Sequence, residues 1–265
     1  MSNYSLLDHP QILQNAFFPI KEWSVCPDYA TDIFVAVDSG TNVACRFFAA
    51  SPEYPTILFF HGNGEIASDY DDIAPFFFTR CNANLVVAEF RGYGASGGDP
   101  TFSAVISDAH IIFREVCGEI SKRGYRNEFW IMGRSMGSVP ALELAKHYPK
   151  EISGLIIESG FPSATRIARR LGLPIPEADV KLIEDECQQK MRAITVPALI
   201  IHGEADSLVS INEAYTLEME LGSSEKRLCV IRGADHNSVM AMDITGYFNA
   251  IKSIMRKQQD GICNV

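Results

Sequence analysis

Three separate stretches of this 265-residue chain contain the residue types that activate a hydroxyl nucleophile. Ser135 lies in the sequence GRSMG, Asp206 in HGEADSLV and His236 in GADHN. A serine hydroxyl is a weak nucleophile near neutral pH, so it needs a base within hydrogen-bond reach, and that base needs a third group to hold its tautomer. These types and their order predict a catalytic triad of Ser135, Asp206 and His236.

Each of the three residues follows a short apolar run that predicts a buried strand. The runs are Phe129–Met132, Ala198–Ile201 and Leu228–Ile231. A Gly-x-Ser-x-Gly sequence between a strand and a helix is typical of a nucleophile elbow, a tight turn that exposes the serine hydroxyl. The carboxyl ends of parallel strands meet at one edge of a sheet, so we expect the three side chains to converge there.

A fourth element must donate hydrogen bonds to the oxygen that becomes negative in the transition state. His61-Gly62-Asn63-Gly64-Glu65 follows another apolar run, and its glycines let the backbone approach a substrate closely. We expect the backbone amides of Asn63 and Met136 to form this oxyanion hole, with the Gly64 amide as the alternative to that of Asn63.

The elements that must position these residues alternate between apolar runs and helix-length segments, a pattern typical of a mostly parallel α/β sheet with helices on both faces. We expect about eight strands, of which the first two form an antiparallel hairpin. The expected strands are Asp32–Asp38, Val43–Ala49, Thr56–Phe60, Leu85–Phe90, Phe129–Met132, Gly154–Ile157, Ala198–Ile201 and Leu228–Ile231. The expected helices are Ile66–Arg80, kinked or broken at Pro75, Phe102–Ile120, Met136–His147, Ile211–Glu220 and Val239–Lys257.

The length predicts a single domain over residues 1–265. One connection, residues 161–195, is too long for a simple crossover and contains three prolines, so we expect it to form a small helical cap within that domain. Its apolar side chains could cover a pocket at the strand ends, and an ordinary crossover without substrate contact is the alternative. These side chains are Ile167, Leu171, Leu173, Ile175, Val180, Leu182 and Ile183.

The composition argues against several classes of protein. A formal charge of −10 disfavours binding to nucleic acid. We find neither a membrane-spanning apolar stretch nor a secretory signal, so we expect no integral membrane segment and a cytoplasmic location. Seven scattered cysteines without a CxxC pair indicate reduced thiols, and Cys263 is misplaced for prenylation. The oligomeric state stays open.

Other conspicuous residues have simpler structural explanations. We expect structural roles for His61 and His202, and no metal or cofactor, since no metal-ligand spacing accompanies them. The glycine-rich sequence RGYGASGG, residues 91–98, lacks the spacing of a phosphate-binding loop and is interpreted as a turn.

Two charged groups in the chain invite a binding role. Arg166, Arg169 and Arg170 share a helix face and could attract an anionic group, although a solvated face is the simpler interpretation. Glu65, Glu158 and Ser159 lie at strand ends, where a peptidase could hold a substrate amine, although a charge at a helix N-terminus is the simpler interpretation of Glu65.

The motifs HGNGE, RGYGASGG, GRSMG, HGEADSLV and GADHN, taken together, resemble the α/β-hydrolase superfamily. The similarity is greatest to the small-cap branch of monoacylglycerol-lipase-like esterases and serine-aminopeptidase-like hydrolases. It covers residues 56–236 and implies Ser135 as nucleophile, Asp206 as acid, His236 as base, and Asn63 and Met136 as oxyanion donors.

This resemblance implies hydrolysis of a carboxylic ester or thioester, a small-molecule acyl substrate, through an acyl-enzyme on Ser135. An aminopeptidase or amidase of the same fold is the alternative. A non-catalytic binding member of the superfamily is a third possibility.

Overall fold

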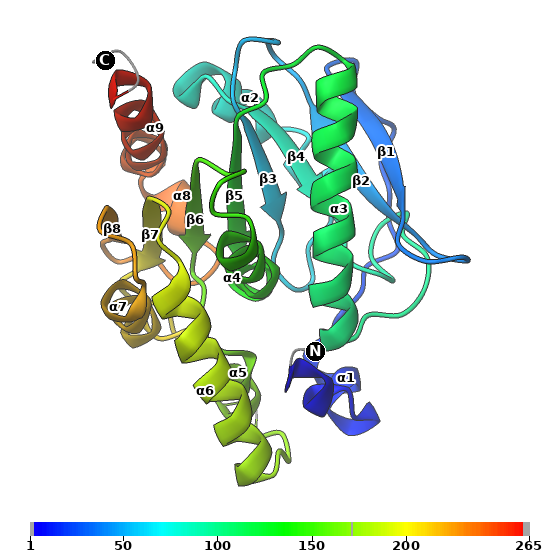
Figure 1. Ribbon diagram of the computed structural model, residues 1–265, viewed down its shortest axis with the longest axis vertical. Coiled ribbons are helices and arrows are strands. Elements are labelled where there is room, and N and C mark those ends of the chain that lie inside the picture. Colours follow the sequence, from blue (N-terminus) through cyan, green and yellow to red (C-terminus); the bar gives the residue numbers. More distant parts are fainter. Residues whose placement is uncertain (1–2, 171, 262–265) are drawn as a thin grey trace.

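The computed structural model describes residues 3–170 and 172–261, and an eight-stranded sheet forms its centre (Figure 1). The strand order is β1-β2-β4-β3-β5-β6-β7-β8. The β1–β2 and β2–β4 pairs are antiparallel, and every later pair is parallel, which confirms the expected hairpin and mostly parallel sheet. The strands are β1 (Ala30–Ala36), β2 (Asn42–Phe48), β3 (Thr56–Phe60), β4 (Asn84–Ala88), β5 (Phe129–Arg134), β6 (Gly154–Glu158), β7 (Ala198–Gly203) and β8 (Lys226–Ile231).

Helices cover both faces of the sheet. One apolar core includes residues of α3, α4, α6 and α7, and the other includes residues of the short helices after β3 and of α9. The helical segments are η1 (Asn3–Leu7), α1 (Pro10–Ala16), η2 (Ala67–Tyr70), α2 (Ala74–Phe76), η3 (Phe77–Cys81), α3 (Phe102–Lys122), η4 (Ser135–Gly137), α4 (Ser138–His147), α5 (Ala164–Arg170), α6 (Glu177–Ala193), α7 (Ile211–Glu220), α8 (Val239–Met242) and α9 (Ile244–Gly261).

The long helix α3 illustrates how the sequence positions these layers. Thr101 accepts a hydrogen bond from the Ala104 amide at 3.0 Å and so caps the first turn. From there Val105, Ile112 and Val116 recur on one face and are buried in the core. The burial of these side chains holds α3 against the sheet beside α4, the helix that follows Ser135 (Figure 1).

One expectation is confirmed and two are wrong in detail. Residues 66–80 are broken as expected, because the segment is divided into η2, α2 and η3, with Pro75 in the first turn of α2. The helix expected over Val239–Lys257 is divided into α8 and α9 at Asp243, whose carboxylate accepts the Gly246 amide at 2.8 Å. The run Leu228–Ile231 is buried only at Ile231, because β8 is an edge strand.

Residues 161–195 carry α5 and α6, and Figure 1 shows them below the sheet on the side where α1 also lies. Val180 and Ile183 are buried and Leu182 is 52% exposed. Within the described residues, these three side chains do not line the large cavity beside Ser135, so the expectation that they cover it is wrong. Leu173 does line it. Leu171 and the side chain of Ile167 lie outside the described residues, and the division into one domain with a cap stays a prediction.

Six cysteines fall within the described residues and all are free thiols, as expected. Cys263 lies outside the described residues. No helix in the described part of the chain is both long enough and apolar enough to cross a membrane. The predicted cytoplasmic location stays a prediction.

Candidate functional site

Ser135 occupies a strained turn between β5 and α4. Its φ of 51° lies in the left-handed region, which a non-glycine residue seldom adopts. A Cβ at Gly133 would overlap the backbone of Gly137, and a Cβ at Gly137 would overlap the carbonyl of Phe60. Only glycine therefore fits on either side of the serine. The Ser138 hydroxyl donates to the Ser135 carbonyl at 2.6 Å and further fixes the turn.

The three residues predicted as a triad are brought together in one chain of hydrogen bonds. His236 Nε2 lies 3.0 Å from Ser135 Oγ, and His236 Nδ1 lies 2.7 Å from Asp206 Oδ2. All three residues are buried, with relative exposures between 6% and 8%. The arrangement allows His236 to take the serine proton while the carboxylate orients the imidazole.

The Asp206 carboxylate is held by four groups. Its Oδ1 accepts the amides of Leu208 at 2.9 Å and Val209 at 2.7 Å, and its Oδ2 faces His236 and, at 3.4 Å, His202 Nε2. Burial alone would raise the pKa of Asp206, but the hydrogen bonds from His202, His236 and the Val209 amide outweigh it and hold that pKa well below its usual range. Asp206 is therefore a carboxylate at neutral pH.

The loop predicted to supply the oxyanion hole lies beside Ser135, and both Asn63 and Met136 line the adjoining cavity. The loop is braced from behind by Glu65, whose Oε2 accepts the Gly62 amide at 2.9 Å and the Tyr70 hydroxyl at 2.8 Å. Gly64, the alternative donor, has a φ of 75°, a conformation that suits glycine. This brace fixes the backbone of the loop before a substrate arrives.

Sequence reasoning missed Arg134, the variable residue of the GRSMG motif. Its guanidinium pairs with Glu65, lies 3.2 Å from Glu158 Oε1, and donates to the His236 carbonyl and Asn237 Oδ1 at 3.0 Å each. Arg134 thus connects the loop after β3, the end of β6 and the histidine loop. The signal was faint, because the position inside a Gly-x-Ser-x-Gly motif is free to vary.

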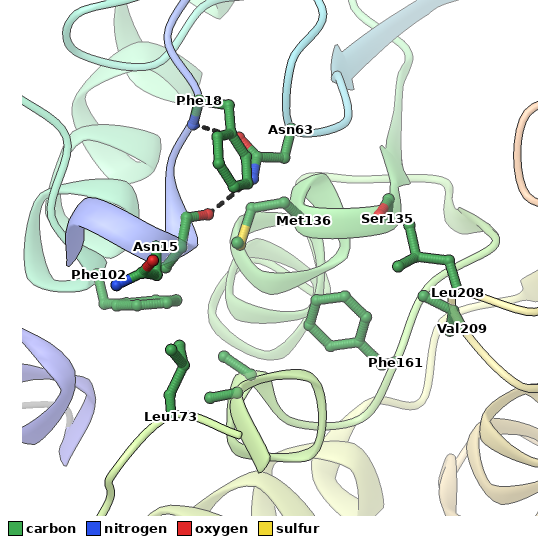
Figure 2. Close-up of a pocket in the computed structure, with 13 residues that line it drawn as sticks. Asn15, Phe18, Asn63, Phe102, Ser135, Met136, Phe161, Leu173, Leu208 and Val209 are labelled. Atoms are coloured by element: carbon green, nitrogen blue, oxygen red, sulfur yellow. Dashed lines mark hydrogen bonds between the residues drawn. The ribbon is translucent and has the colours of Figure 1, made fainter. Parts of the chain in front are cut away.

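An apolar cavity of about 310 Å³ opens beside Ser135 (Figure 2). Several separate parts of the chain line it. The segment after β6 contributes Phe161, Ala164, Ala168 and Leu173, α3 contributes Phe102, and the loop after Asp206 contributes Leu208 and Val209.

Another wall of the cavity was not predicted. It consists of Asn15, Ala16 and Phe18, which belong to α1 and the residues directly after it. Within the described residues, no side chain that lines the cavity carries an ionisable acid or base. The cavity therefore suits an uncharged, apolar group attached to the atom that Ser135 would attack.

A comparison with known protein families matches residues 52–175 and 178–242 to the family described as serine aminopeptidase, S33. The chain belongs to this family of α/β-hydrolases. Human α/β-hydrolase domain-containing protein 17B is 31% identical over 208 residues, which cover 76% of this chain and 67% of that protein. The 17C protein of Xenopus tropicalis is 28% identical over 210 residues, 76% of this chain and 63% of that protein.

Solved structures of esterases share the fold of this hydrolase. An esterase of Pyrococcus furiosus superposes with a TM-score of 0.72 at 16% identity over 90% of this chain and 98% of that one. Est1E from Butyrivibrio proteoclasticus, solved with bound ferulic acid, superposes with a TM-score of 0.69 at 19% identity over 86% of this chain and 99% of that one. The expected α/β-hydrolase fold is confirmed.

The other histidines beside the site of this hydrolase have structural partners. His61 is fully buried between Glu89 Oε2, 2.9 Å from its Nε2, and the Gly62 carbonyl, 2.8 Å from its Nδ1. The Nε2–H of His202 donates to the Val209 carbonyl at 2.8 Å and supports the Asp206 loop. Both therefore hold loops around Ser135.

One group could offer three ligand atoms to a metal ion: His110, Glu143 and His147, whose atoms lie within 4.8 Å of one another. Glu143 Oε1 lies 2.9 Å from His147 Nδ1, and its other oxygen pairs with the buried ammonium of Lys190. The Lys190 charge would oppose a cation, so the group is explained as an ion-pair network.

The arginines of α5 do not line the cavity. Arg166 pairs with Glu213 at 2.9 Å, Arg169 pairs with Glu177, and Arg170 donates to the Ser207 carbonyl. They tie α5 to neighbouring segments, so the simple solvated face expected for them is only partly correct. Glu65 and Glu158, weighed as holders of a substrate amine, are both paired with Arg134.

Proposed function

We propose that this hydrolase cleaves carboxylic esters or thioesters through an acyl-enzyme on Ser135. The observation that carries the proposal is the hydrogen-bonded chain from Ser135 Oγ through His236 to Asp206, which opens onto an apolar cavity. The hydrogen-bonded chain would activate the serine as a nucleophile, and the cavity would accommodate an acyl chain.

In the first half of the reaction, His236 Nε2 takes the Ser135 proton as the oxygen attacks the acyl carbon. The backbone amides of Asn63 and Met136 hold the resulting oxyanion, and the N-terminus of α4 adds its positive end. His236 then gives the proton to the departing alcohol or thiol, and the acyl group stays on Ser135.

In the second half, His236 takes a proton from water, which attacks the acyl-enzyme. The tetrahedral intermediate collapses, the proton returns to Ser135 and the acid leaves. Asp206, ionised throughout, stabilises the imidazolium that forms twice in each cycle.

An aminopeptidase must also bind a substrate ammonium, and this requirement separates the two candidate substrates. The cavity walls offer no carboxylate among the described residues, and Glu65 and Glu158 are paired with Arg134. These features support an uncharged acyl group over an amino-terminal residue as the group bound beside Ser135.

The test compares Ser135→Ala with the wild type on p-nitrophenyl acyl esters, acyl thioesters and aminoacyl anilides. Ester turnover should fall on the order of 10⁶-fold, because loss of one member of a triad costs nearly as much as loss of all three. Ser107→Ala, which removes an exposed serine of α3, is the matched control. Fluorophosphonate should label the wild type and the control but not Ser135→Ala.

Two results would count against the proposal. Anilide cleavage faster than ester cleavage would favour the aminopeptidase. Absence of fluorophosphonate labelling in the folded wild type would favour a non-catalytic binding protein.

A further inference from the structure

The N-terminal segment, residues 3–18, lies outside the region matched by the family model, yet it forms part of the cavity beside Ser135. It contains η1 and α1 and then passes the loop after β3. In Figure 1 it lies opposite α5 and α6, at the N-terminal end of α3. The cavity is thus bounded on one side by a part of the chain that the family match does not include.

Asn63 fastens this segment directly to the loop proposed to bind the oxyanion. Its side-chain Oδ1 accepts the Phe18 amide at 2.9 Å, and its Nδ2 donates to the Ala16 carbonyl at 2.7 Å (Figure 2). The Tyr93 hydroxyl also contacts Asn63 Oδ1 and lies 2.9 Å from the Phe18 amide. One asparagine side chain therefore joins this wall to the loop whose backbone is proposed to bind the oxyanion.

The segment is also attached at its other end. The Asp8 carboxylate accepts the Phe102 amide at 2.7 Å, at the start of α3. The Tyr4 hydroxyl lies 3.3 Å from Cys187 Sγ on α6, and the Tyr4 side chain is 2% exposed. Leu7, Ile12 and Phe17 are buried in the main core. With attachments to the β3 loop, α3 and α6, the segment is a fixed wall.

The position of this wall sets how much of an acyl chain the cavity can bury. Figure 2 shows Asn15, Phe102 and Leu173 at the end of the cavity away from Ser135. Phe18 lies close to Asn63, and its side chain is 57% exposed. An acyl group bound to Ser135 would extend past Met136 toward Asn15.

We propose that the N-terminal segment determines acyl-chain length, with Asn15 as its limiting residue at the far end of the cavity. The proposal rests on the proposed ester hydrolysis and adds its specificity determinant. Asn15 is itself exposed, so a chain that reaches it gains the full apolar contact of the cavity, whereas carbons beyond it pass into water and gain no further burial. The rate should therefore rise with chain length and then level off.

The experiment fills the far end of the cavity and leaves the catalytic residues untouched. Asn15→Trp places an indole at the limiting position, and Gln14→Trp places the same group at the neighbouring exposed position of α1, which does not line the cavity. Both are measured on p-nitrophenyl esters from acetate to laurate, with thermal unfolding as the check of folding.

Asn15→Trp should shift the best substrate to a shorter acyl chain and lower kcat/KM for the longest accepted ester by roughly tenfold or more, with a much smaller effect on acetate. Gln14→Trp should keep the wild-type profile. Phe18→Ala, an independent variant with an exposed side chain, should raise KM for long esters more than for acetate. Equal profiles for the two tryptophan variants, or equal loss at all chain lengths, would overturn the inference.

Alkyl fluorophosphonates of increasing length separate this inference from the proposed function. If Ser135 reacts with none of them in the folded wild type, ester hydrolysis itself is refuted, and the specificity proposal is refuted with it. If Ser135 reacts and the labelling rates of Asn15→Trp and Gln14→Trp depend equally on alkyl length, hydrolysis stands and the role of the N-terminal segment is refuted.

Discussion

Replacing Arg134 by methionine would keep a flexible apolar stem at the end of β5 and remove the guanidinium that joins three loops. The Glu158 side chain is 7% exposed and would lose its cation, keeping the Tyr247 hydroxyl at 2.6 Å. Glu65 would lose its ion pair, and the His236 carbonyl and Asn237 would each lose a donor.

The size of the effect follows from these contacts. A hydrogen bond to a charged group contributes about 1.5–3 kcal/mol, and removing one partner of a buried ion pair costs about 3–5 kcal/mol because the other charge stays buried. The Arg134 side chain is 11% exposed, so water can reach part of the cluster. We therefore expect Arg134→Met to lower the free energy of unfolding by about 3 kcal/mol, the lower end of that range.

Urea denaturation and ester kinetics measure the two consequences separately. Loosening of the histidine and oxyanion loops should lower kcat more than it raises KM, since the cavity walls are untouched. The double variant Arg134→Met/Glu158→Gln should recover part of the lost stability, because both charges are removed together. A decrease in the free energy of unfolding below about 0.5 kcal/mol, the range of ordinary surface substitutions, together with an unchanged kcat would show that Arg134 does not stabilise the three loops.

Two further predictions concern the Asp206 carboxylate and the nucleophile turn. Asp206→Asn should lower kcat on the order of 10⁴-fold with little change in KM, because an amide would present a donor to His236 and favour the wrong tautomer. Because folding lowers the pKa of Asp206, its ionised carboxylate stabilises the fold at pH values above about 3.9, the pKa of the unfolded carboxyl group. This stabilisation is lost as the pH falls below that value, so between pH 7 and pH 3 the melting temperature of Asp206→Asn should fall less than that of the wild type. An equal fall would contradict this prediction. Gly137→Ala should lower the free energy of unfolding by about 1–3 kcal/mol or prevent folding, because the new Cβ would overlap the Phe60 carbonyl. Gly118→Ala, in open space on α3, should raise the free energy of unfolding by about 0.5–1 kcal/mol. Calorimetry that ranks the two variants the other way would refute the packing argument.

The convergence of Ser135, Asp206 and His236 could be predicted from the sequence because the signals that place them at strand ends are local. A glycine-flanked serine after an apolar run specifies a strand, a turn and a helix within a few residues, and the loops of Asp206 and His236 follow strands in the same way. The parallel sheet then brings these distant positions to one edge. The helix breaks near Asp243 and the exposure of β8 were missed, since the first depends on one side-chain cap and the second on which strand lies at the edge.

The cavity walls were harder to predict because they depend on contacts between residues far apart in the chain. Nothing in the sequence near Asn15 indicates that it lines the same cavity as Leu173. The hydrogen bonds of the Asn63 side chain likewise join it to residues 45 and 47 positions earlier in the chain. Arg134 is similar, since its partner carbonyl belongs to a residue 102 positions later. Such pairings are decided by tertiary packing, which a periodic pattern does not encode.

The strand order has a practical consequence for anyone who divides this chain by homology. The family match begins at residue 52, after β1 and β2, and β2 pairs with β4. A fragment cut at that boundary would retain Ser135, Asp206 and His236, but it would leave β4, whose residues are all buried, with an unprotected edge. Such edges recruit other strands, so the fragment should aggregate. In this chain, the region matched by the family model is shorter than the unit that should fold intact.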